Sequence, residues 1–372
     1  MAGKQLHIES FQSVSPVRMS DPGRSRPITA AAPLSAEALQ SRFVVIFYYN
    51  KAFEHESALL LAAWMRESLG VALVEEPALA GRLRRPANGG DDGLWEIKAN
   101  DAGVRLVQAS LDMTISDFLD LKDRKQKESL LAYWADVDKE NPDYSALFYV
   151  QVTRFQEEGY SIGISCSLLL ADPWQLTKFL KSWALTHAQM LSQGHLLKDP
   201  IFHLSYFQRR ANPNYIKSMP LDYSSKPTIT TATTTMLFKS SQKQKPSKLM
   251  PSLNKLVASE AVSKLGDHGA AGGVSNFYLF LSEEKSLKVE RWSEDVRTNG
   301  PFINVEVVHW EEFGRVEELS LMEGNKAVHV SYDIISCGNG EGIVVVMSPE
   351  PHDEEGDSNL VISATIPTGV EN

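Results

Sequence analysis

The sequence predicts an α/β protein, and three stretches of the chain support that class. Residues 147–191 have the pattern strand, turn, strand, sharp corner and helix. Residues 43–49 form a continuous apolar run of strand length, and an amphipathic helical pattern over residues 54–70 follows it. Strand-like runs dominate from residue 302 onward. The length of 372 residues suits two domains or one large one.

The stretch over residues 147–191 organises the prediction. Residues 147–152 and 160–166 have strand composition and are separated by a turn at Glu158-Gly159, which predicts neighbouring antiparallel strands. Asp172 suits a helix N-cap, and Pro173 suits the first helical position, where its missing N–H costs nothing. As an N-cap alone, Asp172 should contribute about 0.5–2 kcal/mol, the usual cost of replacing such a residue by alanine.

Local signals place the other N-terminal elements. Residues 94–98 and 104–109 have strand composition and flank the turn-forming residues 100–103, which predicts a hairpin. Thr114 and Asp117 have the spacing of a capping box. The further expected elements are a strand over 7–17, a loop over 21–27, a buried strand over 43–49, a helix over 54–70 and a helix over 125–137.

The composition changes after the helix that ends near Leu191. Residues 224–248 are rich in Ser, Thr, Lys and Pro, which predicts a linker with one strand over 233–239 inside it. The expected organisation is a domain over residues 1–215, a crossover linker over 216–248 and a smaller domain over 249–372. In the last part we expect a helix over 253–265, strands over 302–308, 327–335, 343–347 and 360–366, and a hairpin turn at 338–340.

Charge and composition narrow the function classes. The net charge of −10 argues against general nucleic-acid binding. Cys166 and Cys337 lack metal-ligand spacing, and buried reduced thiols of a cytosolic protein explain both. Residues 1–10 lack the apolar core of a signal peptide, and no run approaches the length of a transmembrane helix. We therefore expect a cytoplasmic protein without a membrane span or a metal site, most simply a monomer.

Four phrases of the sequence then point to a family. They are Pro-Ala-Leu-Ala-Gly-Arg-Leu-Arg over residues 77–84, Asn-Asp-Ala-Gly-Val over 100–104, Leu-Phe-Tyr-Val-Gln-Val over 147–152 and Gly-Tyr-Ser-Ile-Gly-Ile-Ser-Cys over 159–166. In this order they resemble the plant BAHD acyltransferases, and the resemblance covers about the first 210 residues. It implies two α/β domains with mixed sheets, here with a reduced second domain. It also implies transfer of an acyl group from acyl-CoA to an alcohol or amine in a channel between the domains.

The resemblance assigns a general base to the corner after residue 166, and the sequence departs from the family there. The family's HxxxD motif, whose His deprotonates the acceptor, aligns with Leu168-Leu169-Leu170-Ala171-Asp172. Leu168 cannot accept a proton, and the Asp is chiefly structural in the family. The second motif, DFGWG, is reduced to Phe313 and Gly314, and the section between residues 239 and 302 is shortened.

Several residues are candidates to replace the lost base. His309 and His329 lie in strand-like runs of the C-terminal part and could face a domain interface. His187 lies beside the apolar stripe of the helix after the corner, which favours a structural histidine. Ser165, Cys166 and Ser167 could act as nucleophiles, but the sequence around them lacks the Gly-x-Ser-x-Gly elbow.

Three functions are consistent with these patterns. The first is a weak or non-catalytic member of the BAHD lineage that binds or regulates a partner protein, such as an active acyltransferase or a lipid-elongating enzyme. The second is acyl transfer with a substitute base, with acyl-CoA as a co-substrate and no tightly bound cofactor. The third is a lyase or cyclisation reaction in the old channel. The surroundings of Leu168 should separate them, because an apolar plug there favours a binding protein.

Overall fold

The computed structural model describes most of the chain. The predicted helix over residues 253–265, the turn at 338–340 and residues Phe313 and Gly314 lie outside the described residues. The described ranges are 4–21, 23–30, 34–50, 58–85, 94–194, 216–221, 233–240, 276–282, 286–293, 305–310, 325–335, 341–347 and 361–367.

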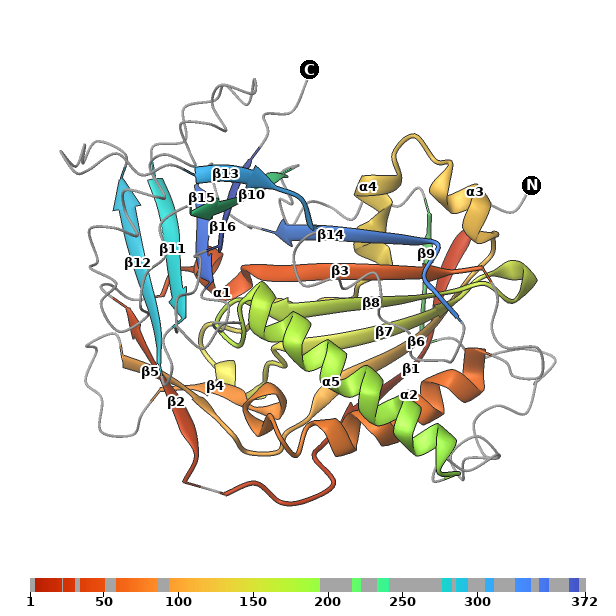
Figure 1. The fold of residues 1–372 in the computed structure, drawn as a ribbon, viewed down its shortest axis with the longest axis horizontal. Helices are drawn as coiled ribbons and strands as arrows, with labels where there is room; N and C mark the ends of the chain where they lie inside the picture. Colours follow the sequence, from red (N-terminus) through yellow and green to blue (C-terminus); the bar gives the residue numbers. More distant parts are fainter. Residues whose placement is uncertain are drawn as a thin grey trace.

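A seven-stranded sheet lies at the centre of the molecule, with the strand order β14-β3-β8-β7-β6-β1-β9 (Figure 1). Neighbouring strands are antiparallel, except that β6 and β7 are parallel. We call it the first sheet. Its strands are β1 (Gln5–Val14), β3 (Arg42–Tyr49), β6 (Val104–Leu111), β7 (Phe148–Arg154), β8 (Tyr160–Ser167), β9 (Lys217–Pro220) and β14 (His329–Ile335).

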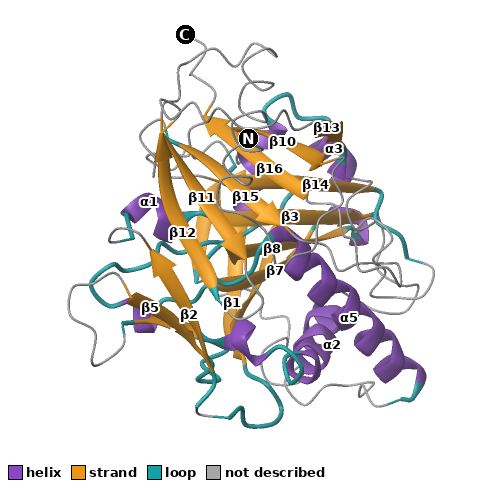
Figure 2. Cartoon of the chain, turned by 60° about the vertical axis from the view of Figure 1, so that its left-hand side comes forward, coloured by secondary structure: helices purple, strands orange, loops and turns teal. Residues whose placement is uncertain are grey.

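The second sheet has nine strands in the order β13-β10-β16-β15-β11-β12-β2-β5-β4 (Figure 2). It is also mixed, because β11 pairs with β15 and β12 pairs with β2 in parallel. Its strands are β2 (Ser25–Ala30), β4 (Arg82–Arg84), β5 (Leu94–Lys98), β10 (Thr233–Ser240), β11 (Asn276–Ser282), β12 (Leu287–Ser293), β13 (Val305–Val308), β15 (Gly342–Met347) and β16 (Val361–Pro367).

The two sheets exchange strands between distant parts of the sequence. Strands β2, β4 and β5 come from the N-terminal part of the chain and complete the second sheet, whereas β14 comes from the C-terminal part and forms an edge of the first. The α/β class with mixed sheets is thereby confirmed. The domain limits at residues 215 and 249 stay predictions.

Helices cover the first sheet on both faces. The face that carries Phe43, Val45 and Phe47 of β3 packs under α2 and α5, which also contact each other, and we call it the α5 face (Figure 1). The opposite face carries Val44 and Ile46 and packs under α3, so we call it the α3 face. None of the helices in the described ranges is long and apolar enough to cross a membrane. The helices are α1 (Ala36–Gln40), α2 (Ala58–Ala72), α3 (Ile115–Leu119), α4 (Arg124–Lys127) and α5 (Pro173–Ser192), and short 3₁₀ turns cover Pro77–Ala80, Glu128–Leu130, Pro142–Tyr144 and Gln156–Glu158.

The unit that organised the sequence prediction is confirmed. Strands β7 and β8 are antiparallel neighbours, and Pro173 is the first residue of α5. The five-residue turn between the strands, residues 155–159, holds Glu157 and Glu158 at positive φ, 56° and 64°.

Two predicted hairpins are wrong. Strand β5 belongs to the second sheet, where it pairs with β2 and β4, while β6 belongs to the first sheet. Strands β14 and β15 are divided between the sheets in the same way. Turn-forming residues permit a chain reversal, but the strands that bury each face decide which edges pair, and that choice depends on contacts distant in sequence.

The predicted helix over 125–137 is also wrong beyond its first residues. Only α4 and one 3₁₀ turn are helical, and the chain then runs irregularly over the α3 face. Side chains of the sheet satisfy its backbone: Gln151 accepts from the N–H of Tyr133 (2.9 Å) and donates to the carbonyl of Leu130 (2.9 Å). Gly163 allows this approach, because a Cβ there would lie 1.9 Å from the carbonyl oxygen of Leu131. Tertiary contacts therefore override helix propensity.

Candidate functional site

The corner between β8 and α5 holds Leu168, the residue to which the sequence resemblance assigns the position of the family's general base. Leu168 occupies that position with a side chain that is 1% exposed, and it belongs to the apolar core of the α5 face. The next three residues are buried as well. The N–H of Leu168 donates to the carbonyl of Ser41 (3.0 Å), which holds the corner against the start of β3. The corner thus contributes packing and offers no proton acceptor at this side chain.

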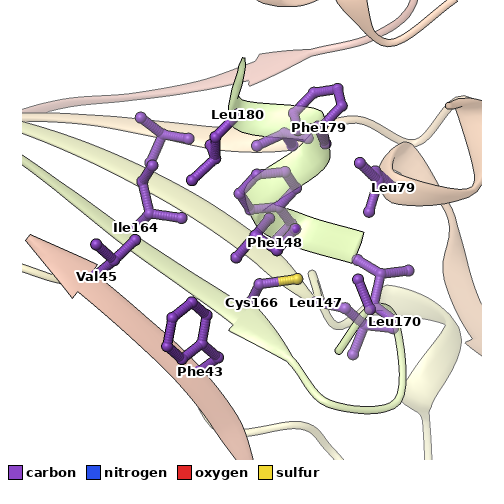
Figure 3. Close-up of a cluster of buried hydrophobic side chains, with 14 of the residues drawn as sticks. Phe43, Val45, Leu79, Leu147, Phe148, Ile164, Cys166, Leu170, Phe179 and Leu180 are labelled. Carbon is purple, nitrogen blue, oxygen red and sulfur yellow. The ribbon is translucent and has the colours of Figure 1, made fainter. Parts of the chain in front are cut away.

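The possible nucleophiles beside the corner are buried too. Cys166 lies among Phe43, Leu147 and Phe148 (Figure 3), and burial raises the pKa of its thiol. Ser165 donates its hydroxyl to the carbonyl of Ala132 (3.1 Å). The hydroxyl of Ser167 accepts from the N–H of Leu169 (3.2 Å). These groups serve packing and local hydrogen bonding, and each is 0% exposed.

Asp172 caps α5 as the sequence indicates. One carboxylate oxygen, Oδ1, accepts from the N–H of Gln175 (2.9 Å), and the Gln175 side chain accepts from the N–H of Asp172 (3.4 Å). This is a reciprocal capping box with glutamine in the third helical position. The Asp-Pro pair therefore has a complete local explanation at the start of the helix.

Asp172 also connects the corner to the second sheet, which the sequence did not indicate. Its carboxylate is hydrogen-bonded to Ser282 at the end of β11 and faces the charge of Arg26 on β2. The Arg26 guanidinium donates to the carbonyls of Leu170 (3.0 Å) and Ser286 (3.4 Å). Burial raises the pKa of Asp172, and the neighbouring donors and Arg26 oppose that rise. The corner is a junction between the two sheets, and a buried carboxylate (Asp172) and a half-buried guanidinium (Arg26) lie at it.

His187 is a structural histidine. Its Nδ1 lies 2.8 Å from the hydroxyl oxygen of Ser68, which also accepts from the indole N–H of Trp183 (2.9 Å). Ser68 donates to the carbonyl of Met65 (3.2 Å), so the proton of the pair lies on Nδ1. Nε2 finds no hydrogen-bond partner among the described residues. Burial lowers the pKa of His187 to about 4, and the neutral ring joins α2 to α5.

His309 is exposed and follows β13 directly. The neighbouring Trp310 stacks on Phe43 with ring centroids 5.4 Å apart, and Phe43 is the register partner of Cys166. His309 is therefore adjacent in sequence to a residue that packs near the corner end of β3. No hydrogen bond or ion pair orients its side chain toward the corner within the described ranges.

His329 belongs to a hydrogen-bonded chain on the α3 face. Ser331 donates to Oε1 of Glu128 (2.6 Å), so the ring N–H at Nε2 of His329 donates to Ser331 (3.1 Å). The same carboxylate oxygen accepts from the hydroxyl of Tyr48 (3.1 Å) and lies 3.5 Å from Nε of Arg124. Burial and then Arg124 lower the pKa of His329, whereas Glu128 raises it.

The sheet register separates His329 from the corner. His329 is paired with Tyr48, whereas Ser167, next to Leu168, is paired with Arg42. Six residues of β3 span about 20 Å at the usual rise of a strand. His329 thus lies too far from Leu168 to deprotonate a substrate held at the corner.

Two residues of the predicted site are not described by the structure, and two residues that were not predicted lie at the corner. No group of three or more His, Cys, Asp or Glu side chains in the described ranges is arranged to hold a metal ion. Phe313 and Gly314 lie outside those ranges. Arg26 and Ser282 are the residues that sequence reasoning missed. A lone arginine in a predicted loop and a serine in an unpredicted strand carry no local signal of such a junction.

Comparison with known sequences gives a family match and partial relatives. The profile of the Transferase family matches residues 38–270, more than half of the chain. Protein ECERIFERUM 26-like of Arabidopsis thaliana is 36% identical over 114 residues, which are 30% of this chain and 25% of that protein. Hydroxycinnamoyltransferase of Narcissus pseudonarcissus is 32% identical over 141 residues, which are 37% of this chain and 30% of that protein. The matches thus span well under half of the relatives' own length.

Comparison with solved structures concerns the fold. The crystal structure of vinorine synthase superposes with a TM-score of 0.50 and covers 97% of this chain and 95% of that one. The sequence identity is 13%. The two-domain α/β architecture with mixed sheets is thereby confirmed.

Proposed function

Since this chain belongs to the Transferase family, the family of the plant BAHD acyltransferases, we propose that it is a member that binds or regulates a partner and has lost acyl transfer. The observation that supports this proposal most directly is the burial of Leu168. The position of the family's base holds an aliphatic side chain that is 1% exposed within the core. A positioned general base contributes roughly 10²- to 10⁴-fold to such a reaction.

The ionisable groups at the corner support the same proposal. Cys166 and Asp172 flank Leu168, and burial raises the pKa of both. Asp172 is committed to the helix cap and to the junction with the second sheet. Neither group is placed to take a proton from a substrate hydroxyl or amine.

The proposal includes ligands and partners of the family type. Acyl-CoA is the donor named for one similar protein, the hydroxycinnamoyl-CoA-dependent transferase of Actaea racemosa. We propose that acyl-CoA or an acyl acceptor is a ligand of this chain without being turned over. The partner protein would be an active acyltransferase or a lipid-elongating enzyme. This chain would bind it in the cytoplasm as a monomer.

Acyl transfer by this chain is the second candidate, and one observation favours it. His309 is exposed, and its neighbour Trp310 packs on Phe43 close to the corner. If a substrate lay between the sheets, His309 would be the histidine to examine as a substitute base. No arrangement of side chains in the described part of the chain favours the lyase or cyclisation alternative.

Release of free CoA tests the proposal. The full chain is mixed with a panel of acyl-CoA donors and of alcohol and amine acceptors, and the thiol of free CoA is followed. We expect release no faster than with protein denatured beforehand, because the general base is absent. Robust turnover of any pair that is lost in the His309→Ala protein would contradict the proposal and establish the second candidate. Turnover that persists in His309→Ala would contradict both assignments.

A further inference from the structure

The α3 face of the first sheet carries a continuous group of aromatic rings at the end where β1, β6 and β7 lie side by side. Phe11 and Tyr133 pack edge to face with centroids 5.0 Å apart. Tyr149 lies 5.5 Å from Tyr133 and 5.4 Å from Trp134, measured between ring centroids. Arg105 is the register partner of Tyr149. We call these five residues the aromatic–arginine patch.

The patch reaches the surface. Phe11 is 39% exposed, which is high for a phenylalanine in a strand. Arg105, Tyr133 and Trp134 are half-buried, and Tyr149 forms the buried floor of the patch. Helix α3 does not cover this end of the strands, because it packs at their other end, near Leu6, Leu111 and Tyr48.

A second arginine, Arg82, is close enough to the patch to interact electrostatically with Arg105 and Tyr149. Arg82 on β4 is 2% exposed and donates to the carbonyls of Gly81 (2.8 Å) and Ala102 (3.1 Å). Burial, and then the charge of Arg105, lower the pKa of Arg82, while Tyr149 raises it. Arg105 forms no ion pair with any residue that the structure describes. The positive charge of Arg105 thus acts on Arg82, and neither guanidinium forms an ion pair with a residue in the described ranges.

We propose that the aromatic–arginine patch docks an acidic segment of a partner protein. A carboxylate of that segment pairs with the guanidinium of Arg105, and an apolar side chain lies against Phe11 and Tyr133. The inference deepens the proposed function, since it names the surface and the chemistry through which a binding protein meets its partner.

Composition and charge favour a protein over other anionic partners. Tyr, Trp, Phe and Arg are the residues enriched in the cores of protein interfaces, and Arg binds a carboxylate in a fixed bidentate geometry. A lipid surface or a nucleic acid needs a cluster of several basic residues, whereas this patch presents one cation, the half-buried Arg105. The chain carries a net charge of −10, so an acidic partner is repelled elsewhere and attracted at a local positive site.

The test uses defined peptides and the full chain. Twelve-residue fluorescent peptides with a central phenylalanine flanked by Asp and Glu are compared with peptides in which Asn and Gln replace the acids. We expect the acidic peptides to bind at least tenfold more tightly, by fluorescence anisotropy. Arg105→Glu should remove at least that tenfold preference. Lys181→Glu makes the same charge change on the exposed side of α5 and should leave the affinity unchanged.

Stability and other ligands complete the test. The urea midpoint of Arg105→Glu should equal or exceed that of the wild type, because the substitution relieves repulsion from Arg82 and adds an acidic partner. Equal affinity for acidic and amide peptides would overturn the inference. So would equal losses in Arg105→Glu and Lys181→Glu, or Arg105-dependent binding of phosphatidylserine vesicles without peptide binding. If neither peptide binding nor CoA release is observed, only the inference about the aromatic–arginine patch is contradicted. If CoA is released, only the proposed loss of acyl transfer is contradicted.

Discussion

Restoring histidine at the family's base position should destabilise the protein without restoring transfer. In Leu168→His an imidazole replaces a side chain that is 1% exposed in the apolar core. The two nitrogens of the imidazole would lose their hydrogen bonds to water, and the core around them is apolar. Burying such a group and losing leucine packing should cost about 2–4 kcal/mol of unfolding free energy. Burial also favours the neutral ring, and the described side chains around Leu168 are those of the apolar core.

Chemical denaturation of Leu168→His measures this effect, with Leu168→Met as the matched control. Methionine conserves volume and polarity, so the control should lose less than about 1.5 kcal/mol. A histidine variant as stable as the control, with CoA release well above the wild type, would mean that the corner is open and still built for catalysis.

Asp172→Ala should have the second large effect. The helix cap alone predicts a loss of about 0.5–2 kcal/mol. The structure raises that expectation, because the buried carboxylate also meets Ser282 and the charge of Arg26 across the junction. Removing the carboxylate takes a hydrogen-bond partner from Ser282 and an opposite charge from the neighbourhood of the half-buried Arg26, and leaving a buried polar group without its partner typically costs about 1–3 kcal/mol. Arg26 keeps its two carbonyl acceptors, so together with the lost cap we expect a loss of about 3 kcal/mol.

A serine variant separates the two roles of Asp172. Asp172→Ser keeps an N-cap acceptor but loses the charge, so it should lose about 2 kcal/mol, and the difference between serine and alanine reports the cap. A double-mutant cycle with Arg26→Met should give a coupling of about 0.5–3 kcal/mol. Equal unfolding curves for serine and wild type would show that the cap is the whole contribution.

The sequence predicted the parts of the corner that depend on neighbours in the chain. The antiparallel pair β7–β8 and the Asp172-Pro173 start of α5 follow from a turn and a cap, whose signals are local. The junction with Arg26 and Ser282 could not be predicted, because it depends on β2 joining β12 in the second sheet. Those residues are distant in the sequence and carry no periodic signal that connects them.

Close packing against the sheet explains the other failures. Residues 131–137 have helical composition, yet Gln151 and Ser165 satisfy their backbone from the sheet, and Gly163 permits the contact. The sequence pattern also could not show how far His329 lies from Leu168. Only the register of β14 on β3 places His329 at the far end of the sheet.

The accessibility of Cys166 tests most directly whether the corner is closed. Cys166 is 0% exposed beside Leu168, and the chain has two cysteines, so Cys337→Ser leaves Cys166 as the single thiol. The variant is treated with iodoacetamide at pH 8, folded and in urea, and the labelled fraction is followed by mass spectrometry. A closed core predicts that folded protein stays unlabelled over the period in which unfolded protein is labelled completely, because the thiol is buried and its pKa is raised. Labelling of the folded protein at the rate of an exposed thiol would show that small molecules reach the corner, and would contradict the account.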